Sequence, residues 1–415
     1  MSEPAMPVRW LFAVPAQLLL CAAVIGCSTI RVDDRRSPEG TTPGTSASAR
    51  SVDQTARAPA VSAQGVTVPP VTRRADDARA LLDRLLPRGV DERDGWAVDI
   101  LTAFGALQIP PDAERLCAVI AVIEQESSFV ADPPVPGLAR IAWQEIDRRR
   151  ERYGIPKLVL DLALGRSSPD GRSYRERVDA LRTEKQMSLL YEEMIAELPG
   201  GRTLFAGYNP VRTGGPMQVG IEFAEEQVRR KPYPYPRSGG VRAELFTRRG
   251  GVYFGVASLL DYPVNYGEMI YRFADFNAGR YSSRNAAFQD AVVRLSGRQL
   301  ALDGDLLRYR EGVALSEVSD SQRAVIALQG RLQMAPGEIG RDLRLEKSAA
   351  FEKTPLYLRL YALADAASGG RRPRETLPQI ALSSPKISRR LTTEWFARRV
   401  DGRYRSCLAR SRQEG

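Results

Sequence analysis

Apolar residues recur every three to four positions over much of the chain after residue 76, the spacing that turns one face of an α-helix toward a core. This spacing predicts helices at residues 78–86, 94–107, 138–152, 183–198, 295–307, 316–332 and 354–367. Residues 116–123 are apolar on every side of a helix that begins after Pro111 and Asp112, which is typical of a buried helix. The pattern therefore predicts a mainly all-α protein.

The first 27 residues have the features of a leader peptide. Arg9 precedes an apolar stretch at 10–25, which has the length of a secretory h-region and is marginal for a membrane span. The stretch ends at Gly26-Cys27 and resembles the lipobox of bacterial lipoproteins, in which the cysteine thiol accepts a diacylglycerol. Ser28 follows, rather than the aspartate that often signals inner-membrane retention, so the resemblance implies an outer-membrane lipoprotein facing the periplasm, held in the membrane through Cys27. An ordinary cleaved signal or a short anchor helix is the alternative.

Residues 28–75 are rich in Ser, Thr, Ala, Pro and charge and show no apolar periodicity. Such a segment cannot bury enough surface to offset its ordering entropy, so we expect a flexible tether. A tether of this length reaches on the order of 40 Å.

The composition restricts the chemistry. The chain has no histidine, which excludes Ser-His-Asp and Cys-His nucleophiles and most zinc sites. The net charge of +10 is spread over scattered arginines with interleaved acids, and the leader exports the chain, so we expect weak attraction to anionic wall polymers or lipids and no nucleic-acid partner. The sequence contains no metal-ligand cluster and no phosphate-binding loop, and we expect neither a metal nor a cofactor.

Four cysteines occur in the chain. Cys21 leaves with the leader and Cys27 is lipidated, so Cys117 and Cys407 are the only pair left in an oxidising compartment. A bridge between them would close a loop of about 290 residues and add roughly 5 kcal/mol in the chain-entropy model. Two unpaired buried thiols are the alternative, and the sequence leaves both open because it gives no Cα separation.

Three short fragments carry groups suited to sugar chemistry: Glu126-Ser127-Ser128-Phe129, Gly215-Pro216-Met217-Gln218 and Phe276-Asn277-Ala278-Gly279. Their order resembles the signature of the lytic transglycosylases, goose-lysozyme-like enzymes that cut peptidoglycan strands. Residues 250–260 also resemble that family's glycine-initiated helix, and Asn277 follows Gly255 by 22 residues, close to the family's interval. The resemblance implies a lysozyme-like domain at 76–295, followed by a helical extension at 296–415.

Glu126 is the expected catalytic residue. It lies at the end of the buried helix, where desolvation and the helix dipole both disfavour the carboxylate and raise its pKa, as a general acid requires. The resemblance implies that Glu126 protonates the bond between N-acetylmuramic acid and N-acetylglucosamine and then deprotonates the muramyl C6 hydroxyl, while the substrate's acetamido group replaces a second carboxylate. Glu124 is the other glutamate nearby, but it does not occupy the glutamate position of the motif. The implied substrate-binding residues are Ser127, Gly215, Met217, Gln218, Phe276 and Asn277.

Two features depart from the family pattern. Phe276 stands where the family has a tyrosine that steadies the glutamate, and Tyr253, Tyr271 or Tyr281 could supply the missing hydroxyl. Gln218 follows Glu126 by 92 residues, whereas the family usually needs about a quarter of that. The excess, 138–213, is a helical insertion that forms a lid, a surface for a cell-wall protein partner or a remodelled, inactive cleft.

Three functional hypotheses remain. The first is a peptidoglycan lytic transglycosylase that forms 1,6-anhydro products, and the second is a muramidase hydrolase of the same fold. The third is a non-catalytic lipoprotein that binds peptidoglycan or recruits a partner with a degenerate cleft. The whole pattern also resembles proteobacterial lipoproteins classified only as a domain of unknown function, and that likeness supplies no activity.

Overall fold

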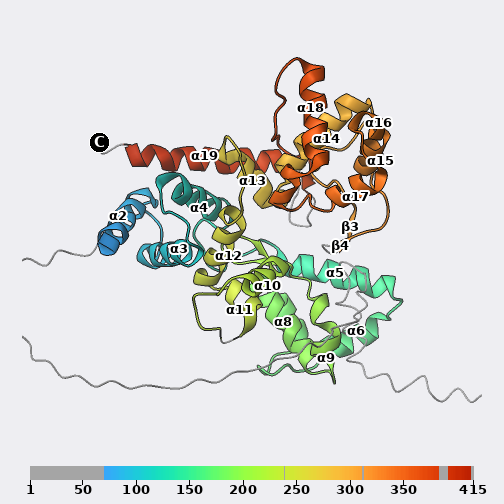
Figure 1. The fold of residues 1–415 in the computed structure, drawn as a ribbon. Coiled ribbons are helices and arrows are strands. Elements are labelled where there is room, and N and C mark those ends of the chain that lie inside the picture. The colour runs from blue at the N-terminus through green and yellow to red at the C-terminus, as the bar shows by residue number, and fades with distance from the viewer. Residues whose placement is uncertain (1–69, 238, 311–312, 383–390, 413–415) are drawn as a thin grey trace, which may run out of the picture.

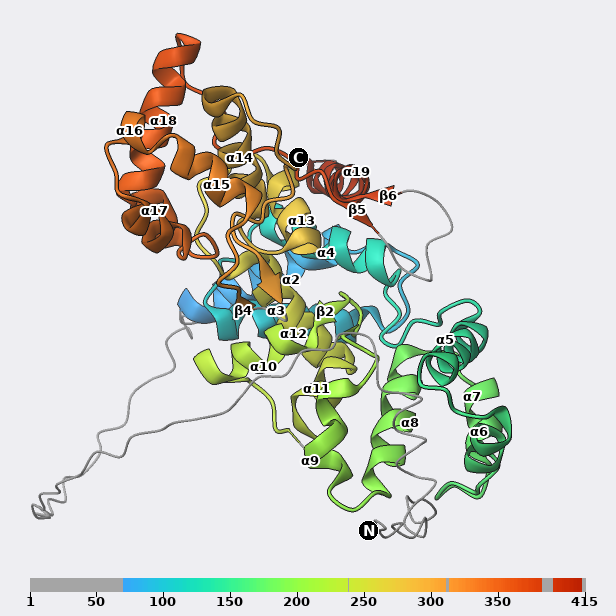
Figure 2. The same cartoon turned by 90° about the vertical axis from the view of Figure 1, so that its right-hand side faces the viewer.

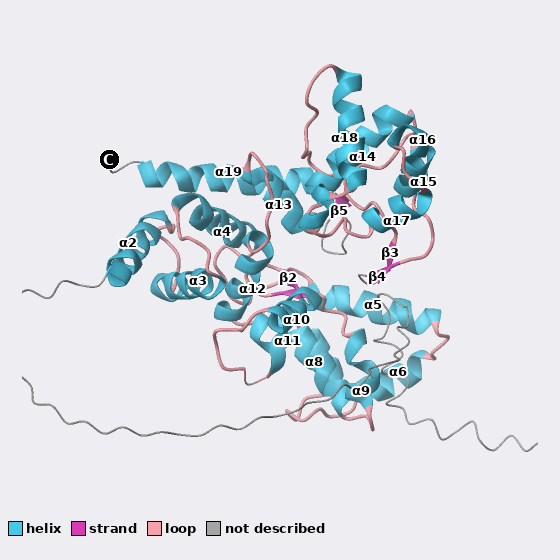
Figure 3. Cartoon of the chain, viewed as in Figure 1, coloured by secondary structure: helices cyan, strands magenta, loops and turns pink. Residues whose placement is uncertain are grey.

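The computed structural model describes residues 70–237, 239–310, 313–382 and 391–412 (Figure 1). These residues form the helices α2 to α19, and their only sheets are three two-stranded hairpins (Figure 3). The all-α prediction is therefore confirmed. The predicted leader, Cys27 and most of the predicted tether lie outside the described residues, and helix α2 already begins at Pro70, within the predicted tether. None of the helices in the described ranges combines the length and the apolar character needed to cross a membrane.

The main hydrophobic core joins both ends of the described chain. Its helices are α2 (Pro70–Leu85), α3 (Arg93–Leu107), α4 (Ala113–Glu126), α10 (Ile221–Arg230), α11 (Gly240–Leu245), α12 (Arg248–Leu260), α13 (Met269–Ala278) and α19 (Thr393–Arg412). The late helix α19 packs along α4 and also contacts α13 and α2 (Figure 1). Residues far apart in the sequence therefore enclose one core.

Helix α4 is the buried helix that the sequence predicts. The Asp112 side chain caps it by accepting a hydrogen bond from the Arg115 backbone N–H at 2.8 Å. Every residue from 116 to 123 is buried. Cys117 of α4 is bonded to Cys407 of α19, with 5.5 Å between their Cα atoms, so the structure has the bridge rather than two free thiols.

The insertion has a small hydrophobic core of its own. Its helices are α5 (Leu138–Arg152), α6 (Lys157–Leu164), α7 (Tyr174–Asp179), α8 (Glu184–Ala196), α9 (Gly201–Phe205) and the 3₁₀ turn η1 (Ala206–Tyr208). Capping boxes with Ser173 and Thr183 as the N-cap residues begin α7 and α8. The short hairpin of β1 (Thr213–Gly214) and β2 (Val219–Gly220) leads back into the main core.

A C-terminal lobe forms the third core. It contains α14 (Ser282–Ser296), β3 (Tyr309–Arg310), β4 (Val313–Ala314), α15 (Asp320–Ala327), α16 (Gln329–Leu332), α17 (Pro336–Leu343), η2 (Ala349–Lys353) and α18 (Pro355–Ser368). The strands β5 (Ala381–Leu382) and β6 (Leu391–Thr392) then lead into α19. In both views the lobe lies in the upper part of the molecule and the insertion in the lower part (Figures 1 and 2).

The predicted helix at 295–307 is wrong. Gly297, with φ of 68°, ends α14, because this left-handed conformation stops the helix and its N–H donates back to the Val293 carbonyl. The residues of the predicted extension, 296–415, belong to two different cores. Helix α14, which precedes it, belongs to the C-terminal lobe, and α19 belongs to the main core.

Candidate functional site

Helix α12 lies at the centre of the three sequence fragments. It contacts α4, which ends at Glu126, the strand β2, which follows Gln218, and α13, which carries Asn277. Each fragment also contributes one apolar side chain to the main core: Phe129 and Met217 are buried in it, and Phe276 packs against it. The three fragments are therefore fixed to one body.

The second fragment forms the turn of the β1–β2 hairpin. Gly215 has φ of 73°, and a Cβ atom at this position would lie 2.2 Å from the Leu245 carbonyl oxygen. Met217 is fully buried against α12, where a Cβ atom on Gly255 would lie 2.1 Å from its sulfur. Glycine at these two positions therefore allows the close approach of hairpin and helix. This is a physical role for the glycines that the sequence pattern singled out.

Gln218 projects from this turn toward the insertion. Its Nε2 donates to Oε2 of Glu184, the first residue of α8, over 3.0 Å. Its Oε1 accepts a hydrogen bond from the Thr213 hydroxyl at 3.2 Å. The Gln218 backbone has φ of 52°, a left-handed conformation that the hairpin imposes.

The residue before Glu184 contacts the loop after Glu126. The Thr183 hydroxyl donates to Oδ2 of Asp132 over 3.0 Å, and a β-bridge joins Thr183 to Pro134. We call these two adjacent residues the Thr183–Glu184 clamp, because one holds the loop that follows the first fragment and the other holds the second fragment. The insertion is therefore part of the candidate site.

Asp132 is a carboxyl group that the sequence analysis did not single out. Burial raises its pKa, and the negative charge of Glu184 raises it further, while the Thr183 hydrogen bond and the positive charge of Lys185 oppose this shift. The sequence offered no local signal for this, because the partners lie about fifty residues away.

Glu126 is the last residue of α4 and is half-buried. The chain turns sharply after it: Ser127 is buried, with its hydroxyl bonded to the Ile123 carbonyl at 3.1 Å, and Ser128 and Phe129 both have left-handed φ values, 50° and 63°. Left-handed residues other than glycine persist where their surroundings enforce them. Here the Phe129 ring packs edge-on against Trp96, with 5.3 Å between ring centroids. The raised pKa expected of Glu126 stays a prediction.

Glu124, the other glutamate at this helix end, faces α19. Its Oε1 lies 3.7 Å from Nε of Arg403. This ion pair joins two helices of the main core, which is a structural role for Glu124.

In the third fragment, Asn277 is exposed, and its Oδ1 accepts a hydrogen bond from the Thr393 hydroxyl at 2.9 Å. Thr393 is the first residue of α19 and is buried. No sequence motif singles out Thr393 or Glu184, because both contacts are made between segments distant in the chain.

Asp275 fixes the loop after α13. This buried carboxyl accepts hydrogen bonds from the Tyr266 hydroxyl at 2.7 Å and from the backbone N–H groups of Ser283 and Tyr281 at 2.6 and 2.9 Å. Burial raises its pKa, and these hydrogen bonds oppose that shift. Asp275 thus joins α13 to the start of α14.

The three tyrosines considered as substitutes for the missing hydroxyl have other contacts. The Tyr253 hydroxyl donates to the Pro232 carbonyl at 3.2 Å. The Tyr271 ring packs against Tyr266, and the Tyr281 ring lies 4.4 Å from the Arg284 guanidinium carbon. These contacts do not join any of the three to Glu126.

The three fragments thus place one carboxyl group and two primary amides on one hydrophobic core. Amides can both donate to and accept from an acetamido group, and a carboxyl group can transfer a proton. Within the described ranges, no group of three or more acidic, cysteine or histidine side chains could hold a metal ion.

Comparisons with known proteins identify the family. Residues 89–410 match the family model described as protein of unknown function (DUF1615). The chain is also 50% identical to the uncharacterized protein YaiW of Escherichia coli (strain K12) over 335 residues, which cover 81% of this chain and 90% of that protein. No solved structure matches. On the extent of both matches, the chain belongs to the DUF1615 family of proteins of unknown function.

Proposed function

We propose that this protein is a lytic transglycosylase that cleaves the bond between N-acetylmuramic acid and N-acetylglucosamine in periplasmic peptidoglycan and forms a 1,6-anhydro product. The observation that carries the proposal is the attachment of all three fragments to one core around α12. Glu126, Gln218 and Asn277 are each half-buried or exposed, while an apolar neighbour in each fragment anchors the backbone.

In the proposed reaction, Glu126 donates its proton to the glycosidic oxygen as the bond to the muramyl C1 breaks. The carboxylate then takes the proton of the C6 hydroxyl, whose oxygen bonds to C1 and closes the anhydro ring. No water is consumed, and Glu126 ends protonated as it began. The amides of Gln218 and Asn277 bind acetamido groups on either side of the cleavage point, and Cys27 anchors the chain to the outer membrane.

The alternative of a non-catalytic peptidoglycan-binding protein has specific support. Both amides already have protein partners, Glu184 and Thr393, so a sugar has to displace or share these hydrogen bonds. The insertion then serves to recruit a cell-wall protein. A muramidase hydrolase of the same fold would differ from the transglycosylase only in its product, which contains one added water.

The deciding experiment uses the chain from Ser28 to Gly415, because a start at Asp76 would remove the first six residues of α2. Purified peptidoglycan is digested, and the products are identified by mass spectrometry. We expect 1,6-anhydromuramyl products, and hydrolysis would yield products heavier by one water.

Glu126→Gln keeps the shape of the side chain but cannot transfer a proton. We expect it to lower the rate by about 10² to 10⁴, the usual contribution of a general acid. The matched control is Glu124→Gln on the same helix end, whose partner is Arg403, and it should retain activity. A folded wild-type domain that releases nothing from several peptidoglycans, yet sediments with them, would overturn the enzyme proposal in favour of the binding protein.

A further inference from the structure

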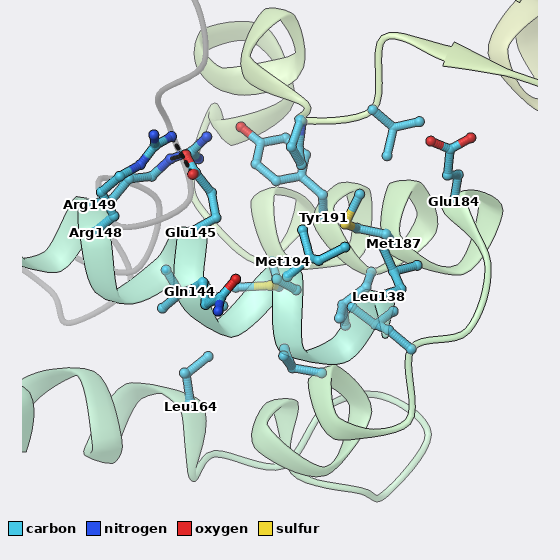
Figure 4. Close-up of a pocket in the computed structure, with 18 of the residues that line it drawn as sticks. Leu138, Gln144, Glu145, Arg148, Arg149, Leu164, Glu184, Met187, Tyr191 and Met194 are labelled. Atoms are coloured by element: carbon cyan, nitrogen blue, oxygen red, sulfur yellow. Dashed lines mark hydrogen bonds and ion pairs between the residues drawn. The ribbon is translucent and has the colours of Figure 1, made fainter. Parts of the chain in front are cut away.

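The insertion forms a cavity of about 490 Å³, partly open to solvent, between α5, α6, α8 and the residues that lead into β1 (Figure 4). Ligand sites of small molecules occupy about 300 to 1,000 Å³. Most of the cavity wall is aliphatic or thioether surface, and its buried members include Leu138, Ile146, Leu160, Leu164 and Met194. Methionine side chains adapt to flexible apolar ligands. The size and the lining therefore suit a small apolar molecule or chain.

One end of the cavity carries a buried cation. Arg149 lines the cavity with only 3% of its side chain exposed, and its Nε donates to Oε1 of Glu145 over 2.6 Å. Its Nη2 is buried and has no hydrogen-bond partner. Arg148 also donates to Glu145, and Figure 4 shows these three side chains together at one side of the apolar group, with Glu184 at the other.

An unpartnered guanidinium nitrogen in a buried position costs free energy, because such a donor gives up its hydrogen bonds to water. Arginine stays protonated and offers only donors, so the missing partner has to be an acceptor. A guanidinium pairs best with a carboxylate or a phosphate. A sugar would not fit the rest of the wall, which has few polar groups to satisfy its hydroxyls.

We propose that this cavity binds a single-chain amphiphile with an anionic head group. The hydrocarbon chain lies among the leucine and methionine side chains. Arg149 Nη2 has less than 1 Å² of exposed surface, so its guanidinium turns toward the cavity for a carboxylate or phosphate oxygen to accept its hydrogen bond. The proposal is independent of the activity proposed for Glu126. It also gives the insertion a ligand next to the hairpin, because Glu184 and Thr213 both line the cavity and both bond to Gln218.

Isothermal titration calorimetry tests the proposal on the chain from Ser28 to Gly415, in detergent-free buffer and with ligands below their micellar concentrations. Dodecanoate and dodecyl phosphate represent the two head groups. Dodecan-1-ol and dodecyltrimethylammonium provide the neutral and cationic comparisons. We expect each protein chain to bind one anionic ligand. Tighter binding of dodecanoate would identify the natural ligand as a fatty acid, and tighter binding of dodecyl phosphate would identify it as a lipid phosphate.

One variant probes the head group of the proposed ligand and another probes its hydrocarbon chain. Arg149→Gln removes the head-group donor and should weaken anion binding about 10- to 100-fold, as expected for a hydrogen bond to a charged group. Arg152→Gln removes the same charge from an exposed position on α5 outside the cavity wall and should bind like wild type. Ala142→Leu narrows the cavity without a change of charge and should also weaken binding.

The thermal unfolding curve of each variant shows whether it folds. If Arg149→Gln does not fold, the test rests on Ala142→Leu. The proposal is overturned if neither anion binds the wild type, or if the alcohol and the cation bind as tightly as the anions. It is also overturned if folded Arg149→Gln and Ala142→Leu both bind like wild type. Peptidoglycan digestion by the same preparations reports separately on the activity proposed for Glu126.

Discussion

Removal of the Cys117–Cys407 disulfide should cost the protein a large part of its stability. The bond joins α4 to α19 across 290 residues of sequence, and both sulfur atoms lie in the fully buried core. The double variant Cys117→Ala/Cys407→Ala opens this loop without placing a new polar group in the core. Either single variant should cost nearly as much, because the constraint needs both cysteines.

The magnitude follows from the length of the loop. In the chain-entropy model, a cross-link over so long a loop lowers the entropy of the unfolded chain enough to stabilise the fold by about 5 kcal/mol. With an unfolding entropy of about 2 cal/mol/K per residue, this corresponds to a fall in Tm of about 7 °C when only the described residues unfold cooperatively.

The assay is thermal and urea unfolding followed by circular dichroism, with non-reducing mass mapping of periplasmic material to verify the bond. Wild-type protein reduced in the unfolded state should behave like the double variant. The prediction is wrong if mapping finds both thiols free. It also fails if the oxidised wild type and the double variant unfold within about 2 °C of each other, because the cross-link would then not constrain the unfolded chain.

Three further outcomes are expected. Cys27→Ser should leave the protein unlipidated and detached from the outer membrane, and recovery of this variant in the wild-type membrane fraction would refute the anchor. Burial raises the pKa of Glu346 from 4.5 to about 7, so the folded state binds this proton more tightly than the unfolded state. The contribution of Glu346 to the free energy of unfolding should therefore fall by about 3 kcal/mol as the pH rises from below 4.5 to above 7. Urea unfolding at pH 4.5 and 8 should show this loss in wild type but not in Glu346→Gln, and equal pH dependence in both would contradict it. Gly255→Ala should cost about 1 to 3 kcal/mol, because its methyl group would overlap Met217. Gly105→Ala, at an exposed position of α3 where the added methyl group meets no other atom, should be neutral or stabilising by up to about 1 kcal/mol in the same unfolding assay. Similar losses in both variants would rule out the packing argument.

The elements that the sequence predicts well are those whose signals are local. Helix α4 is apolar on every side, and that pattern has few solutions other than a buried helix. The predicted helix at 295–307 is wrong because its apolar periodicity continues past Gly297, whose left-handed conformation ends α14. Leu306 and Leu307 are still buried, but in the core of the C-terminal lobe and outside any helix.

The polar contacts of the candidate site could not be predicted in this way. Thr183 is recognisable as a helix N-cap, yet nothing near it in the sequence indicates a bond to Asp132, 51 residues earlier. The bond between Glu184 and Gln218 spans 34 residues. Such pairs are set by how the insertion folds back on the core, and single-sequence periodicity carries no information on that.

The position of α19 sets an order of assembly for the molecule. A chain that emerges N-terminus first completes α2, α3 and α4 long before residues 393–412 exist to cover them. Until then one side of the apolar stretch 116–123 of α4 is open to solvent, and Asn277 lacks the Thr393 hydroxyl. Contacts of such long sequence separation form slowly, because the loop must close before the contact stabilises it. The nascent protein therefore passes through a stage with exposed apolar surface, and chaperones that shield such surface should affect its yield more than its final stability.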